Sequence, residues 1–342
     1  MSTRAFITGI AGLELSAAER EFIHAERPWG FILFKRNIVA PAQVTKLISD
    51  LRTSAGNPEA PVLIDQEGGR VQRFGPPNWP IYPPGAVFGA LYDIDPALGL
   101  EAARLSSRLI ADDLIPLGVT VDCLPLADVP VRGADAVIGN RAYGNEPAKV
   151  AAIGRAVTDG LEQGGVLPVL KHIPGHGRAT ADTHFRLPTV DTPQKELERT
   201  DFAAFRPLAN LPMAMTAHVV FSAVDPAHPA TTSATIIERV IRGVIGFQGL
   251  LMSDDVSMNA LAGSIADRTR AILSAGCDMV LHCNGNLEEM REVARETPEL
   301  SGKALDRAER ALASRQAPQP FDRRAARARL DALIERAGMT GA

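Results

Sequence analysis

Long apolar runs are missing from this sequence, and none of its hydrophobic stretches approaches the roughly 18 residues that a bilayer-spanning helix needs. The first ten residues carry one arginine and no apolar segment ahead of a small-residue cleavage site, so we expect no secretory signal and a cytoplasmic protein. A basic surplus is also missing, because 36 Lys and Arg stand against 40 Asp and Glu and leave a net charge of −4. This balance argues against nucleic acid as a partner.

Cysteine is scarce, and the three that occur cannot form a complete disulfide framework because their number is odd. Cys123, Cys277 and Cys283 lie in apolar runs, so we expect buried, reduced thiols rather than a disulfide or a metal site. An interdomain linker is absent too. The Pro- and Gly-rich stretch Gly75–Gly85 comes too early in 342 residues to separate two domains, and we expect it to form a long loop over one rim.

Eight short apolar runs rich in β-forming residues divide the chain. They do not alternate polar and apolar residues, which is typical of parallel strands buried on both faces. Helical spacing of apolar residues fills intervals between them, as in Leu98–Leu109 and in Val150–Leu161, where Pro147 suits the helix start. The eight runs are Ala5–Ile10, Phe31–Phe34, Val62–Asp65, Val119–Leu124, Leu167–His172, Met213–His218, Gly249–Asp254 and Asp278–His282.

This alternation predicts an α/β fold of the (β/α)8 TIM-type barrel class in one domain, with a doubly wound open sheet as the alternative. We expect residues 1–320 to form the barrel. Residues 321–342 are expected to add a C-terminal helix and tail to the same domain.

Polar side chains follow several of the predicted strands where each strand ends. In a barrel of parallel strands these ends meet on one rim, which is where the active sites of this fold lie. The sequence therefore predicts a polar site on that rim. Its candidates are Asp65, Lys171 with His172, His218, Asp254 with Asp255, and His282.

The segment from Asp65 to Arg73 combines a carboxylate, two glycines and two arginines. Glycine lets the backbone approach a ligand closely, a carboxylate accepts from sugar hydroxyls, and a guanidinium donates to them. We interpret Asp65 and Arg73 as a clamp for hydroxyl groups. The alternative is an ordinary turn in which Asp65 caps a helix.

The segment from Lys171 to His184 carries three histidines. A proline and a glycine in its middle exclude a regular helix, so the first two histidines cannot share a helical face as the zinc ligands of an H-E-x-x-H motif do. Asp182 stands two residues before His184, so its carboxylate can fix the imidazole tautomer and raise the imidazole pKa. His184 is thus a candidate general acid/base, with an exposed histidine in an Asx-turn as the alternative.

Two adjacent carboxylates, Asp254 and Asp255, end the run that starts at Leu250. If both were ionised they would repel, so we expect one to titrate high or nearby cations to hold them. The alternative is a helix N-cap, which Asp255 or Ser257 would suit.

Four motifs, in this order and spacing, carry a family resemblance. They are IDQEGGRVQRF at Ile64–Phe74, IGNRAYG at Ile138–Gly144, KHIPGHGRATADTH at Lys171–His184 and LLMSDDVSM at Leu250–Met258. With them the chain resembles the single-domain bacterial β-N-acetylhexosaminidases of glycoside hydrolase family three, from Ala5 to about Asn284. It departs from the family pattern at Asn140 and Ile173, and neither position is expected to touch the chemistry.

The resemblance implies a role for each matching residue. It makes Asp254 the nucleophile and His184 the general acid/base, with Asp182 as its dyad partner. Gln66 and Glu67 match the motif without an assigned contact. The residues that the resemblance places around a terminal N-acetylglucosamine are Asp65, Arg73, Arg141, Lys171 and His172.

The proton donor is expected on a loop of the barrel itself. Larger family relatives are expected to bring an acid/base glutamate from a second domain, for which this chain has no room. Asp182 with His184 is then the best candidate. Their loop, Ile173–Thr192, is long for a βα connection, and its Gly and Pro content would let it close over a bound sugar.

The resemblance implies a retaining exo-β-N-acetylglucosaminidase that forms a covalent glycosyl-enzyme on Asp254, without a metal or an organic cofactor. The implied substrate is an N-acetylglucosaminyl-anhydro-muramyl peptide of peptidoglycan recycling. We expect no membrane partner, and a monomer or a weak homo-oligomer. Phosphate in place of water would make a phosphorylase. The remaining alternatives are a barrel aldolase with a Schiff base on Lys171 and a sugar-binding protein without turnover.

Overall fold

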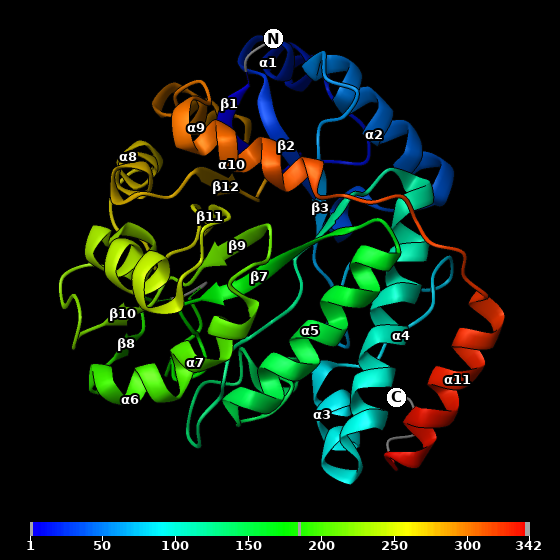
Figure 1. Cartoon of the computed structure of the whole chain (residues 1–342). Coiled ribbons are helices and arrows are strands. Elements are labelled where there is room, and N and C mark those ends of the chain that lie inside the picture. Colours follow the sequence, from blue (N-terminus) through cyan, green and yellow to red (C-terminus); the bar gives the residue numbers. More distant parts are fainter. Residues whose placement is uncertain (1–2, 184–185, 339–342) are drawn as a thin grey trace.

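A closed barrel of eight parallel strands forms the centre of the protein, and helices surround it (Figure 1). The structure is a computed structural model and describes residues 3–183 and 186–338. The order of strands around the barrel is β1-β12-β11-β9-β7-β6-β3-β2, so the first and last strands of the chain pair and close it. The predicted (β/α)8 fold is confirmed, and the open sheet is wrong.

The barrel strands match the eight predicted runs, with ends that differ by up to three residues. The earlier start of β2 at Pro28 follows from Trp29, which is buried in the barrel with the other strand residues. The strands are β1 (Arg4–Thr8), β2 (Pro28–Leu33), β3 (Val62–Ile64), β6 (Val121–Asp122), β7 (Leu167–Ile173), β9 (Met213–Thr216), β11 (Leu250–Asp255) and β12 (Met279–His282).

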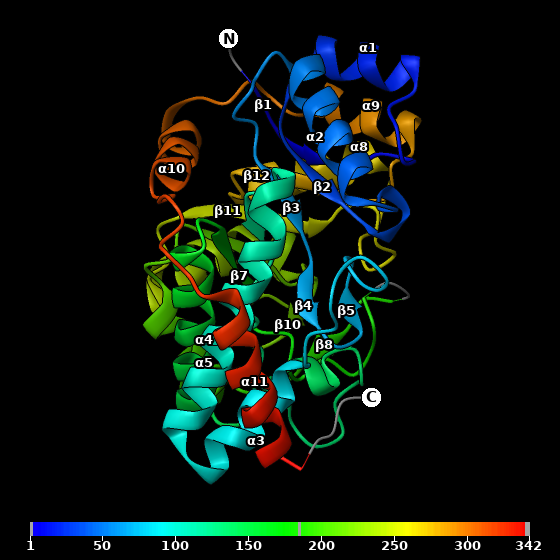
Figure 2. The same ribbon diagram turned by 90° about the vertical axis from the view of Figure 1, so that its right-hand side faces the viewer.

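Two short strand pairs lie outside the barrel. The antiparallel pair β4 (Gln66–Gly68) and β5 (Val71–Gln72) lies beyond the end of β3 (Figure 2). The parallel pair β8 (Thr189–Val190) and β10 (Val220–Phe221) joins the connections that follow β7 and β9. Both pairs therefore lie on the C-terminal rim of the barrel, where the site was predicted.

Helices and tighter turns occupy the connections. The α-helices are α1 (Ala17–Glu26), α2 (Pro41–Ala55), α3 (Gly85–Ile94), α4 (Pro96–Leu114), α5 (Pro147–Gln163), α6 (Gln194–Arg199), α7 (Asp201–Phe205), α8 (Ile265–Ala275), α9 (Leu287–Glu296), α10 (Gly302–Ala313) and α11 (Arg323–Arg336). The 3₁₀ turns are η1 (Lys35–Asn37), η2 (Ile115–Leu117), η3 (Gly139–Arg141), η4 (Arg206–Leu208) and η5 (Ala230–Thr232), and η6 (Ile236–Ile245) is a π-helix. The helix start expected at Pro147 is observed, with that proline in the first turn of α5.

Two layers of apolar side chains explain why the strand runs show no alternation. One layer, with Ile7, Val169 and Met252, fills the inside of the barrel. The other, with Phe6 and Leu170, packs between the strands and the helices. Because successive side chains of a strand point to opposite faces, both faces require apolar residues.

The C-terminal helix α11 lies along α4 in both views (Figures 1 and 2). Arg323 of α11 pairs with Asp112 and Asp113 of α4, and the hydroxyl of Tyr82 donates to Asp113 at 2.6 Å. Tyr82 belongs to residues 75–84, which form the predicted loop before α3. One carboxylate thus fixes both the terminal helix and that loop.

The three cysteines are free and buried, as expected. Among residues 3–183 and 186–338, no helix is both long and apolar enough to cross a membrane.

Candidate active site

A cavity of about 280 Å³ lies at the C-terminal ends of the barrel strands. It brings together side chains from several barrel strands and the loops after them, and these stand up to 251 residues apart in the sequence, from Ile32 to Cys283. Of the eight predicted site residues, His184 lies outside the described residues. The seven others that line the cavity are Asp65, Arg73, Arg141, Lys171, His172, Asp182 and Asp254.

Asp65 stands directly after β3 and binds two positively charged side chains. Lys171 Nζ donates to one carboxylate oxygen at 2.8 Å, and Arg73 Nη2 donates to the other at 2.9 Å. Burial by itself raises the pKa of Asp65, but the two cations outweigh burial and hold that pKa well below its usual range. A carboxylate fixed between two donors keeps free lone pairs for ligand hydroxyls, as the predicted clamp requires.

The β4–β5 hairpin delivers Arg73 to this carboxylate. The side-chain oxygen of Gln66 accepts from the backbone N–H groups of Arg73 and Phe74, at 2.9 and 3.0 Å. Gly68 turns the chain with a φ of +95°, and a Cβ there would lie 2.3 Å from the carbonyl oxygen of Pro83. Gln66 and Gly68 therefore fix the backbone of the hairpin. Asp65 is followed by strand β4 and not by a helix, so the helix-cap alternative for Asp65 is wrong.

Glu67 supplies a second carboxylate beneath Asp65. Lys171 Nζ lies 2.6 Å from its Oε1, and Arg141 binds both of its oxygens at 2.8 Å. Burial raises the pKa of Glu67, and Arg141 and Lys171 overcome it to bring that pKa down to about 2. The Lys171 pKa is raised despite burial by the same two carboxylates. Lys171 is therefore a fixed ammonium, which has no lone pair with which to form a Schiff base.

His172 owes its position to Asp128, a fully buried residue that the sequence reasoning missed. Asp128 Oδ2 lies 2.7 Å from His172 Nδ1, and Oδ1 accepts from the backbone N–H of His172 and of His176, at 3.3 and 2.7 Å. A carboxylate accepts only, so Nδ1 carries the proton and Nε2 is the nitrogen left for the cavity.

His176 completes this wall of the cavity. Its ring lies 5.7 Å from that of His172, and its buried Nδ1 has no hydrogen-bond partner in residues 3–183 and 186–338. Burial and the neighbouring His172 lower the pKa of His176 to about 4, so the ring is neutral at neutral pH. No cluster of three potential metal ligands occurs in the described part of the chain.

Asp254 is the last but one residue of β11 and lies on the opposite side of the barrel from Asp65, since β11 and β3 stand four places apart among eight strands. It is 8% exposed and accepts from the backbone N–H of Asp255 at 2.8 Å. Burial raises the Asp254 pKa, but His218, His172, the Asp255 N–H and Lys171 together lower it below its usual value. An ionised, partly desolvated carboxylate suits nucleophilic attack.

The neighbouring Asp255 has a structural role. Its side chain accepts from the N–H and hydroxyl of Ser257, at 3.0 and 2.6 Å, and from the N–H of Cys283 at 3.1 Å. These bonds tie the loop after β11 to the end of β12. Asp255 forms this turn far ahead of α8, which starts at Ile265, so the helix-cap alternative for it is wrong.

A loop of residues 131–138 forms part of the rim. The carbonyl oxygen of Val137 accepts from Arg70 and, at 3.1 Å, from Arg141. Arg141 therefore joins the rim to Glu67 beneath it. Asp182 and Thr183 line the cavity from the loop after β7.

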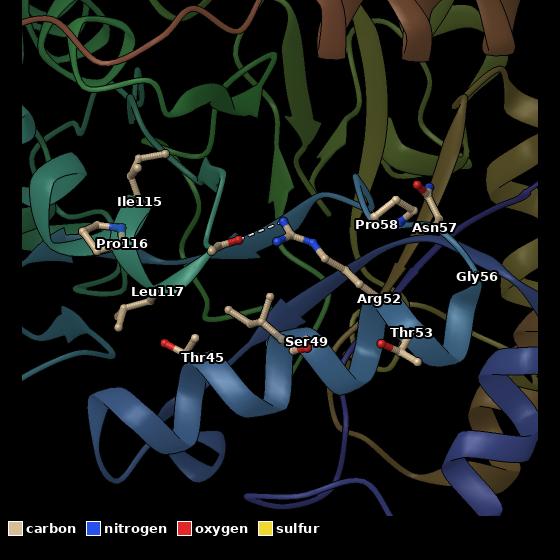
Figure 3. Close-up of a pocket in the computed structure, with 12 residues that line it drawn as sticks. Thr45, Ser49, Arg52, Thr53, Gly56, Asn57, Pro58, Ile115, Pro116 and Leu117 are labelled. Carbon is tan, nitrogen blue, oxygen red and sulfur yellow. Dashed lines mark hydrogen bonds between the residues drawn. The ribbon is translucent and has the colours of Figure 1, made fainter.

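A second hollow, of about 510 Å³, lies at the other end of the barrel (Figure 3). It is bounded by α2 and η2, and its one charged side chain is Arg52. Arg52 donates to the backbone carbonyls of Ala60 and Gly118, at 3.1 and 3.0 Å, just ahead of β3 and β6. The Arg52 guanidinium thus holds the two loops that lead into these strands. The hollow contains no predicted site residue.

The match to known families decides the class of the protein. Residues 7–314 match the glycosyl hydrolase family 3 N-terminal domain. The chain belongs to this family. It is therefore a glycoside hydrolase, and the resemblance found from the motifs is confirmed.

Individual relatives agree with the family. A β-hexosaminidase of Alkalilimnicola ehrlichii is 39% identical over 295 residues, which are 85% of this chain and 83% of that protein. The structure of NagZ from Neisseria gonorrhoeae, in complex with N-trifluoroacetyl-D-glucosamine, is 30% identical with a TM-score of 0.85 and covers 100% of this chain and 99% of its own. A family 3 β-N-acetylglucosaminidase from Paenibacillus is 30% identical with a TM-score of 0.79, covering 99% of this chain and 62% of its own.

Proposed function

We propose that the protein is a retaining exo-β-N-acetylglucosaminidase with Asp254 as its nucleophile. The observation that carries the proposal is the placement of Asp254 across the barrel from the clamp of Asp65 and Arg73. A sugar whose far hydroxyls bind the clamp presents its anomeric carbon to Asp254. A cavity of about 280 Å³ suits one sugar ring, which favours exo action on a terminal residue.

The reaction takes place in two displacements. Asp254 attacks the anomeric carbon, the glycosidic bond breaks, and His184 donates its proton to the departing oxygen. Water then attacks the same carbon, gives its proton to His184, and displaces the Asp254 carboxylate. Two inversions give net retention, and no metal or organic cofactor takes part.

The acid/base assignment to His184 is supported by its neighbour and by its competitors. Asp182 lines the cavity two residues before His184. Glu67 has a pKa of about 2, so at neutral pH it holds no proton to donate. Asp255 is occupied by Ser257 and Cys283.

The substrate is an N-acetylglucosaminyl-anhydro-muramyl peptide released during peptidoglycan recycling, and the enzyme is cytoplasmic, a monomer or a weak homo-oligomer. The β-hexosaminidase relatives and the NagZ complex with an N-acylglucosamine support an N-acetylglucosamine at the non-reducing end. Arg73 and Lys171 supply charged donors for its hydroxyls.

Hydrolysis of a chromogenic β-N-acetylglucosaminide beside the matching β-glucoside tests the activity. We expect the N-acetyl substrate to be preferred, because losing a buried polar contact costs about 1–3 kcal/mol. Equal efficiency on the two contradicts the substrate. Added phosphate should not change the product, and a sugar phosphate would identify a phosphorylase instead.

The nucleophile is tested separately. A slow fluorosugar substrate should label Asp254, as detected by peptide mass spectrometry, and Asp254→Asn should lower kcat by several orders of magnitude while leaving thermal unfolding unchanged. An unlabelled protein that a thiazoline inhibits strongly would instead show attack by the substrate's own acetamido oxygen.

A further inference from the structure

We propose that His218 is a positioning residue that stands behind Asp254 as a buried, doubly protonated imidazole and keeps this carboxylate ready to attack. The inference rests on the proposed role of Asp254 as nucleophile. It concerns a residue that does not line the cavity and therefore does not meet the substrate.

His218 lies two residues beyond the end of β9 and is fully buried. Each of its ring nitrogens contacts one oxygen. Nδ1 is 2.8 Å from the hydroxyl of Thr231, and Nε2 is 3.0 Å from the backbone carbonyl of Asp255. The ring therefore bridges η5 and the end of β11, directly beside the nucleophile.

The contact at Nε2 fixes one proton. A carbonyl oxygen has lone pairs and no hydrogen, so it can only accept. Nε2 must then carry a hydrogen in order to bond Asp255. This leaves the state of Nδ1 to be decided by Thr231.

Thr231 has one hydrogen and three polar neighbours. Its hydroxyl lies 2.8 Å from the hydroxyl of Thr216 and donates to the carbonyl of Ala217 at 3.0 Å. Once that single hydrogen is used on Ala217, the two lone pairs of Thr231 accept from Thr216 and from an N–H at Nδ1 of His218. Only a ring with both nitrogens protonated makes all four bonds, and a neutral ring leaves one unmade.

The Asp254 carboxylate beside the ring can balance this charge. Asp255, the other acid at this end of β11, is committed to Ser257 and Cys283. Among the charged neighbours of Asp254, His218 lowers the Asp254 pKa most, ahead of His172 and Lys171 from β7. Other titratable groups also face this end of β11. His176 and the thiol of Cys283 interact with Asp254, His282 interacts with Asp255, and the thiol of Cys277 faces the carbonyl of Thr231 at 3.7 Å.

Nitrogen-15 NMR of the histidine rings tests the protonation directly on the whole unmodified chain. A doubly protonated ring gives two similar nitrogen shifts, whereas a neutral ring gives two widely separated ones. The His218 signals are those that disappear in His218→Gln, and Thr231→Val, which perturbs them, identifies them if that variant does not fold. We expect the doubly protonated pattern at neutral pH, and a neutral pattern overturns the inference.

The pH dependence of kcat/KM tests the consequence. Without the cation the Asp254 pKa rises, so the acid limb of His218→Gln should move up by about one pH unit, an approximately tenfold loss at pH values below the limb. Thr231→Val should shift it the same way. Thr216→Val breaks a bond in the same network without touching the ring and should leave the limb in place, as a matched control.

The two proposals fail in different ways. A neutral His218, or an acid limb that does not move in His218→Gln, refutes the present inference even when the fluorosugar labels Asp254. A label on another residue refutes the proposed nucleophile, and with it the task given to His218, whatever the NMR pattern.

Discussion

The buried carboxylate of Asp128 lies 2.7 Å from Nδ1 of His172 and holds this ring against the wall of the cavity. The same carboxylate binds the backbone of His172 and His176, so it fixes the ring and the start of the loop together. A hydrogen bond to a charged group contributes about 1.5–3 kcal/mol.

Asp128→Asn should therefore lower kcat/KM by roughly tenfold to a hundredfold, because an amide cannot fix the same tautomer. A double-mutant cycle with His172→Ala checks the cause. If Asp128 acts through His172, the second substitution adds little in a protein that already lacks the ring. Additive losses would mean that Asp128 acts only on the loop.

Lys171→Met should destabilise the fold by about 1.5–3 kcal/mol, because Asp65 and Glu67 lose the cation that they share and keep only Arg73 and Arg141 as partners. Urea denaturation measures the free energy of unfolding. The double variant with Glu67→Gln should recover part of the loss, since it removes one of the two carboxylates. A double variant less stable than Lys171→Met would contradict this account.

Acid should weaken the same network in a defined range of pH. The Glu67 pKa is about 2 in the folded protein and near 4.3 in an unfolded chain. Its ionisation therefore stabilises the fold fully above pH ~4.3, and this contribution is lost as the pH falls towards 2. The difference in unfolding free energy between the wild type and Glu67→Gln should shrink over that range. A constant difference would show that the charge of Glu67 is not the cause.

His184→Ala should harm a natural disaccharide far more than an activated aryl glycoside, because a nitrophenolate leaves almost without protonation and a sugar alkoxide does not. Asp182→Asn should show a weaker form of the same pattern, with the alkaline limb of the pH–rate profile moved down. Steady-state kinetics on the two substrates checks both variants. Equal losses with an unchanged profile would make His184 structural.

The sequence was sufficient for the fold because the barrel strands are buried on both faces and so appear as uninterrupted apolar runs. It also predicted part of the cavity, since Asp65, Lys171, His172 and Asp254 follow such runs directly, whereas His218 and His282, predicted on the same grounds, do not line it. The contacts that hold these cavity residues in place were not predicted. Asp128 and Glu67 find their partners only through strand adjacency, 44 and 74 residues further along the chain.

One signal for Asp128 was present in the sequence. It stands in the apolar stretch 123–129, and burying a carboxylate is costly unless it is paired. This indicates that a partner exists but not which residue it is. The protonation state of His218 could not be predicted from the sequence, because it follows from counting the hydrogens of five groups. Only the fold brings Thr231 and Asp255 to the segment 216–218.

Closure of the barrel by β1 and β12 has a consequence for synthesis of the protein. Phe6 pairs with Val280, so one edge of β1, the first strand to be synthesised, stays unpaired until β12, the last strand, has been synthesised. At roughly 5–20 residues per second, β1 presents an open edge for about 15 seconds to a minute, and β11 adds another as it emerges. Nascent chains of this enzyme therefore keep unpaired strand edges until the final strand is translated, and these edges are what a ribosome-associated chaperone would have to cover.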